Sequence, residues 1–75
     1  MNTAETNAIQ VVVNGQTRRV PRGLDVAQLL KVLEIDPSRV AVELNRSIVP
    51  KPAWTATPVE EGAEVEIVWF VGGGL

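Results

Sequence analysis

The architecture follows from one stretch, Ile9-Gln10-Val11-Val12-Val13-Asn14-Gly15-Gln16-Thr17-Arg18-Arg19-Val20. Its first half is rich in β-branched side chains, which are typical of strands. Asn14-Gly15 between two strand-like runs indicates a tight hairpin, because both residues tolerate the positive φ of a type I′ turn. Pro21-Arg22-Gly23 then interrupts the pattern. The stretch therefore predicts a β-hairpin with strands at 9–13 and 16–20.

One amphipathic helix is predicted directly after the hairpin. Asp25 is a good N-cap, and Gln28 stands three residues later, which completes a capping-box pattern. Apolar side chains then recur at the spacing of one helix face, at Val26, Leu29, Leu30 and Leu33. Asp36-Pro37 ends the segment, because the residue before a proline is pushed out of the α region. Over about nine residues helix propensity supplies little, so packing against a sheet must hold this helix.

The second half of the chain predicts further strands. Residues 40–45 alternate, with Val40, Val42 and Leu44 on one face. A turn at 45–47 leads to a short strand at 48–49. The segment 50–54 contains two prolines and cannot be a central strand, so we expect an irregular or single-turn segment with Trp54 covering the edge of the core.

The last strand is expected from Glu64 to Phe70. Alternation turns Val65, Ile67 and Trp69 toward the helix, and it leaves the other four side chains on the open face of the sheet. These are Glu64, Glu66, Val68 and Phe70.

The predicted order of elements is ββαββ with a further strand. This order indicates an α+β fold of the ubiquitin-like β-grasp type, with a mixed sheet of about five strands packed on one main helix. We expect a disordered N-terminal extension at 1–8, the β-grasp domain at 9–71 and a flexible glycine-rich tail at 72–75.

Composition excludes many functions. A chain of 75 residues forms one domain with a small core, in which an interior substrate pocket is not expected. It contains no cysteine and no histidine, so a thiolate nucleophile and the commonest general base and metal ligand are missing. We expect no metal site, no nucleic-acid partner at a net charge of −2, no membrane span and a cytoplasmic location.

The chain finishes with Val71-Gly72-Gly73-Gly74-Leu75. A run of glycines is flexible and can thread a channel too narrow for side chains. Such an end is often a loose terminus or a cloning remnant, so the pattern alone leaves its role open. Val68 and Phe70 stand just before it on the open face, where a partner could hold them.

Several segments in order resemble the ThiS family, the sulfur carriers of thiamine biosynthesis. They are residues 40–45, Ile48-Val49-Pro50-Lys51, Trp54, Val65-Glu66-Ile67-Val68 and Phe70-Val71-Gly72-Gly73-Gly74. The hairpin turn and the start of the helix match as well, so the resemblance covers most of the chain. It implies a carrier and not an enzyme.

The resemblance also implies a reaction cycle carried out by partners. A ThiF-type enzyme adenylates the terminal glycine carboxylate with ATP, a sulfur donor system converts it to a thiocarboxylate, and thiazole synthase (ThiG) receives the sulfur. On this basis Gly74 is the acyl-bearing residue, and Gly72 and Gly73 are the threading segment. Val68, Phe70 and Val71 are the expected partner contacts. No cofactor is expected on this chain, because ATP is used by the activating partner.

Two positions depart from the family pattern. Trp69 stands where a smaller polar residue is more usual. Leu75 follows Gly74, which then has a peptide carbonyl and no free carboxylate. A vector-derived residue is the preferred explanation of Leu75, and a precursor residue removed by a peptidase is the other.

Other functions use the same kind of tail. The alternatives are the small subunit of molybdopterin synthase, a ubiquitin-like modifier of protein lysines, and a β-grasp interaction domain in which the glycines are a linker.

Overall fold

The hairpin that opens the domain forms where the sequence predicts it. In the computed structural model, which describes residues 7–71, β1 (Ala8–Val13) pairs antiparallel with β2 (Gln16–Pro21). Asn14 and Gly15 have φ values of 49° and 82°, as a type I′ turn requires. β1 begins at Ala8, so this residue lies in the sheet and not in the predicted N-terminal extension. Residues 1–6 of that extension lie outside the described part.

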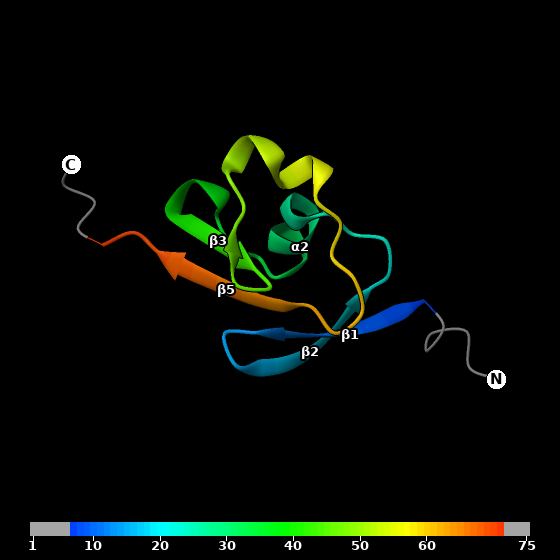
Figure 1. The fold of residues 1–75 in the computed structure, drawn as a ribbon. Helices are drawn as coiled ribbons and strands as arrows, with labels where there is room; N and C mark the ends of the chain where they lie inside the picture. Colours follow the sequence, from blue (N-terminus) through cyan, green and yellow to red (C-terminus); the bar gives the residue numbers. More distant parts are fainter. Residues whose placement is uncertain (1–6, 72–75) are drawn as a thin grey trace.

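The last strand occupies the middle of the sheet. β5 (Glu64–Trp69) lies parallel to β1 on one side and antiparallel to β3 (Val40–Leu44) on the other. The short β4 (Ser47–Ile48) completes a five-stranded sheet of order β2-β1-β5-β3-β4. This is the mixed sheet on one main helix of the predicted β-grasp fold (Figure 1).

The helix α2 (Val26–Val32) begins with the predicted capping box. The Gln28 amide donates to Asp25 Oδ1 at 2.7 Å, and the Asp25 amide donates to Gln28 Oε1 at 3.0 Å. The helix has seven residues and ends earlier than predicted, because Glu34 adopts a left-handed conformation with φ of 60°. The amides of Glu34 and Ile35 donate to the carbonyls of Lys31 and Leu30, which makes a Schellman motif.

Glu34→Gly is expected to stabilise the domain. A side chain in the left-handed region costs roughly 1–2 kcal/mol, part of which is offset by the greater freedom of glycine in the unfolded chain. We expect the free energy of unfolding to rise by about 0.5–1 kcal/mol in urea denaturation. Glu34→Ala is the control, because it removes the same carboxylate and keeps the strain. Equal stabilisation by both variants would assign the effect to charge and contradict this reading.

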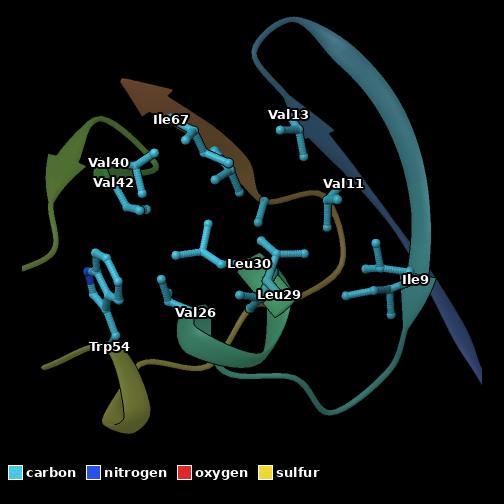
Figure 2. Close-up of a cluster of buried hydrophobic side chains, with 14 residues drawn as sticks. Ile9, Val11, Val13, Val26, Leu29, Leu30, Val40, Val42, Trp54 and Ile67 are labelled. Carbon is cyan, nitrogen blue, oxygen red and sulfur yellow. The ribbon is translucent and has the colours of Figure 1, made fainter. Parts of the chain in front are cut away.

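The core lies between the helix and one face of the sheet. Figure 2 shows side chains of α2 pointing toward those of β1, β3 and β5. The 3₁₀ segment Lys51–Ala56 lies on the same side as the helix (Figure 1), and Trp54 from it closes the core as predicted. The indole Nε1 of Trp54 donates to the Val49 carbonyl at 2.8 Å. The buried set is Ile9, Val11, Val13, Val20, Val26, Leu29, Leu30, Val40, Val42, Trp54, Val59, Ala63, Val65 and Ile67.

A second 3₁₀ turn, Pro37–Arg39, connects the helix to β3. The Asp36 carboxylate caps it, accepting from Ser38 Oγ at 2.7 Å and from the Ser38 amide at 2.9 Å. These hydrogen bonds lower the pKa of Asp36, and the nearby Arg39 guanidinium at 3.4 Å acts in the same direction. Both 3₁₀ segments contact α2 and so lie on the helix side of the sheet. Within residues 7–71, no helical segment covers the opposite face of the sheet.

Candidate functional site

β5 leads directly to the glycine-rich end, and Asn14 anchors its second half. β1 ends at Val13, and its ladder to β5 reaches only Val65. The Asn14 side chain continues that ladder, because its Oδ1 accepts from the Ile67 amide at 2.7 Å and its Nδ2 donates to the Ile67 carbonyl at 3.2 Å. The turn residue therefore imitates one more residue of β1.

Asn45 holds the beginning of β5 in a related way. The Glu64 amide donates to Asn45 Oδ1 at 2.9 Å, and the Asn45 amide donates to the Glu64 carbonyl at 2.7 Å. Asn45 and Arg46 have φ values of 50° and 72° and form the tight turn between β3 and β4. Two turn asparagines thus fix the strand from opposite sides.

The open face carries a small apolar surface at the end of β5. Val68 lies opposite Ala41 of β3, and Ile48 of β4 lies opposite the next residue on that face, Glu43. Val68 is 53% exposed and Phe70 is 62% exposed, and their role as partner contacts stays a prediction. We call Ala41, Ile48, Val68 and Phe70 the open-face patch. The exposed Val71 continues directly from it toward the tail.

Trp69 is not part of the core. Its register partner is the buried Val40, so it points to the helix side of the sheet as expected from alternation. Trp69 is nevertheless 48% exposed, whereas Val40 and Ile67 on the same side of the sheet are buried. It therefore adds exposed aromatic surface on the other side of the strand from Val68.

A hollow of about 220 Å³ adjoins the open-face patch. Ala41, Ile48 and Phe70 of the patch line it together with Pro50, Lys51 and Trp54. The ammonium of Lys51 lies 5.7 Å from the centre of the Trp54 ring, at a distance suited to a cation–π contact. The hollow has room for an apolar side chain of a partner.

Carboxylates border the patch on the side away from the tail. Glu43 and Glu66 are register partners on β3 and β5, so two like charges stand directly opposite each other. Glu64 follows on the same face and lies 3.9 Å from the Nε of Arg46 in an exposed ion pair. Glu43, Glu64 and Glu66 line a second hollow on the sheet. Among the described residues, Arg46 is the cationic side chain that lines it with them.

The remaining predicted site residues are Gly72, Gly73 and Gly74, and they lie outside the described residues, as Leu75 does. Within residues 7–71, no group of three or more acidic side chains is arranged to hold a metal ion. No helix in this part of the chain is long and apolar enough to cross a membrane.

Sequence reasoning missed three parts of this site. Ala41 and Ile48 join the open-face patch only through the pairing of β3 with its neighbours. The bonds from Asn14 to Ile67 join residues 53 positions apart. The alternation of residues 40–45 puts Glu43 on the face away from Val40, Val42 and Leu44, and this is the one available signal for the pair with Glu66.

Known proteins are similar to this chain in sequence and in fold. A thiazole synthase of Paramagnetospirillum magneticum is 41% identical over 66 residues, which cover 88% of this chain and 20% of that protein. The chain therefore spans about a fifth of the length of that relative. The sulfur carrier protein ThiS of Escherichia coli is 27% identical over 88% of this chain and 100% of its own length.

A solved structure and a family model match most of the chain. The crystal structure of the thiamine biosynthesis protein ThiS from Geobacter metallireducens superposes with a TM-score of 0.77 at 36% identity, covering 88% of this chain and 100% of that one. The ThiS family model matches residues 11–74, from the second half of β1 to the third glycine. The chain therefore belongs to the ThiS family.

Proposed function

We propose that this chain is a sulfur carrier for the thiazole moiety of thiamine, with Gly74 as the residue that bears the sulfur. The observation that carries the proposal is the family match through Gly74, on a domain whose central strand leads into the glycines. As a ThiS protein the chain is a carrier and not an enzyme, so its partners supply the catalytic groups. Cytoplasmic location stays a prediction.

The proposed cycle begins at the Gly74 carboxylate. An oxygen of that carboxylate attacks the α-phosphorus of ATP in a ThiF-type enzyme, and pyrophosphate leaves. The acyl adenylate is a good electrophile, whereas a free carboxylate is a poor one. A sulfide equivalent from the donor system forms the carbon–sulfur bond, the bond to AMP breaks, and a thiocarboxylate results. Thiazole synthase then receives the sulfur.

The exposed end of the folded domain is suited to a chain whose terminus reacts inside partner enzymes. Val71 is exposed, and the residues from 71 to 74 span at most about 13 Å when fully extended. That reach allows the acyl group to enter a recessed site while the folded domain stays outside it. Val68, Phe70 and Val71 lie at the exit of the strand, so we propose them as contacts to the partners, with Gly72 and Gly73 as the threading segment.

Intact mass measurement tests the proposal. A chain that ends at Gly74 is incubated with ATP, the ThiF-type enzyme of the same organism and a sulfur donor. The expected result is a mass gain equal to the difference between sulfur and oxygen, localised to the C-terminal peptide. The chain that still has Leu75 is the matched control and should stay unmodified. Failure of the folded, Gly74-ended chain to gain this mass would falsify the proposal.

A role in thiazole formation is favoured over a role in molybdopterin synthesis because a thiazole synthase is among the relatives. Genetic complementation distinguishes the two roles. We expect the gene to restore growth of a thiamine auxotroph that lacks its own carrier and to leave a strain deficient in molybdopterin synthase unchanged. Conjugates linked through Gly74 in cell extract would instead support the modifier alternative.

A further inference from the structure

We propose that the open-face patch docks thiazole synthase through an apolar side chain flanked by arginine or lysine, and that the Glu43–Glu66 pair is kept for this contact. The inference rests on the proposed function for the identity of the partner. It adds the chemistry that the partner must present and the orientation in which it binds.

The first step is an electrostatic conflict inside the sheet. Glu43 and Glu66 are direct cross-strand partners on β3 and β5, where opposed like charges are destabilising. Neither carboxylate has an ion pair within residues 7–71; Arg46 lines the same hollow, and its Nε lies 3.9 Å from Glu64 in an exposed pair. A cationic group of a partner placed over these strands would relieve the repulsion.

The second step is the position of this pair beside apolar surface. Going along β5 from Glu66, the next residue on the same face is Val68, opposite Ala41, and Phe70 follows. Phe70 and Ile48 line the hollow of about 220 Å³, which would accept one apolar side chain. Buried apolar anchors surrounded by a polar rim are the usual composition of a binding hot spot.

The third step is the orientation. Glu43 and Glu66 lie in the same row of the sheet as Ile48, one step before the row of Ala41 and Val68. The cationic Lys51 lines the hollow beside Ile48 and Phe70. A partner with basic residues on one flank of its apolar anchor fits in one direction only. In that direction the described chain runs from Glu66 past Val68 to the exposed Phe70 and Val71, away from the carboxylates.

The charge pattern argues against a second copy of the chain as the occupant. Two copies related by a two-fold axis through the patch would each bring Glu43, Glu64 and Glu66 to the contact. Like-charge juxtaposition across an interface is unfavourable and suppresses such pairing. Thiazole synthase is the chosen occupant because a relative holds a segment like this chain within one thiazole synthase polypeptide.

The test is binding of the full chain to the thiazole synthase of the same organism, measured by titration calorimetry at low and at physiological ionic strength. We expect Glu66→Lys to raise Kd at least about 5-fold at low salt, with a smaller difference at high salt. The same variant should be more stable than the wild type. Its equilibrium constant for unfolding is expected to fall on the order of 3-fold, because a like-charge pair becomes an opposite pair.

The control is Glu60→Lys, which makes the same change in charge on the helix side of the sheet, beside Asp25 and Gln28. It should leave Kd within about 2-fold, as expected for a charge outside the interface. Glu66→Gln serves as a second variant, with an intermediate effect on binding. Ile48→Ala tests the apolar part and should raise Kd at least about 5-fold, since truncation of an interface anchor costs more than about 1 kcal/mol.

Several results would overturn the proposal. These are unchanged binding by Glu66→Lys, equal weakening by Glu60→Lys, no binding of the wild-type chain, or self-association of the wild type in sedimentation that Ile48→Ala abolishes. The assay needs neither ATP nor a sulfur donor. Charge-dependent binding without sulfur loading would remove the proposed function and keep the docking surface, whereas sulfur loading without such binding would do the reverse.

Discussion

Leu29→Ala is expected to lower the free energy of unfolding by about 3 kcal/mol, within the range for buried leucines. Leu29 is 0% exposed and lies on α2 among the core side chains (Figure 2). Its removal deletes apolar contacts and leaves a cavity that a packed core fills only in part. A domain of this size has a stability of only roughly 4–11 kcal/mol, so the loss is a large fraction of the total.

Urea denaturation followed by tryptophan fluorescence measures this change, with Lys31→Ala as the control. Lys31 lies on the exposed side of the same helix, and alanine there should alter stability by less than about 0.5 kcal/mol. A loss below about 1 kcal/mol for Leu29→Ala would contradict the described packing.

Asn14→Gly is expected to cost about 2 kcal/mol, because two hydrogen bonds to the backbone of Ile67 are lost together. Glycine keeps the positive φ of the turn, so the variant isolates the side chain from the backbone. Besides the lower free energy of unfolding of the whole domain, we expect a local loss of protection near Ile67. Hydrogen exchange at the Ile67 amide is expected to accelerate on the order of 10-fold, since that amide loses its acceptor.

Asn45→Gly is a close control for this experiment. Asn45 is also a turn asparagine with positive φ and an amide oxygen bonded to β5, but it makes one exposed side-chain bond, to the Glu64 amide. We expect a loss of about 0.5–1 kcal/mol and unchanged exchange at Ile67. Equal exchange rates at Ile67 in both variants would show that Asn14 does not hold the second half of β5.

Local patterns were sufficient to predict most of the fold. The Asn14-Gly15 turn, the Asp25 cap and the alternation around Val42 each depend on neighbours in sequence, and each forms as predicted. The end of the helix was placed too late, because the apolar period continues to Leu33 while the backbone turns left-handed at Glu34. The spacing of apolar residues alone does not indicate where the backbone becomes left-handed.

The site was harder to predict because it depends on pairing between distant strands. Alternation gave the side on which Trp69 points, but it does not tell whether the side chain at the end of the strand is covered, and Trp69 is half-exposed. Likewise, Val68 was recognisable as exposed from its own strand, while Ala41 and Ile48 became its neighbours only through the register. Glu43 and Glu66 are opposed for the same reason.

The central place of β5 has a mechanical consequence for the proposed use of the tail. The chain enters the sheet at one end of β1 and leaves β5 at the opposite end (Figure 1), and these two strands are parallel neighbours. A pull on the tail therefore acts along the strand, and the bonds to β1, Asn14 and β3 bear the load together rather than opening one at a time. The proposed function requires partner enzymes to draw in the end of the chain and release it, and a strand held on both sides along its length is suited to that load.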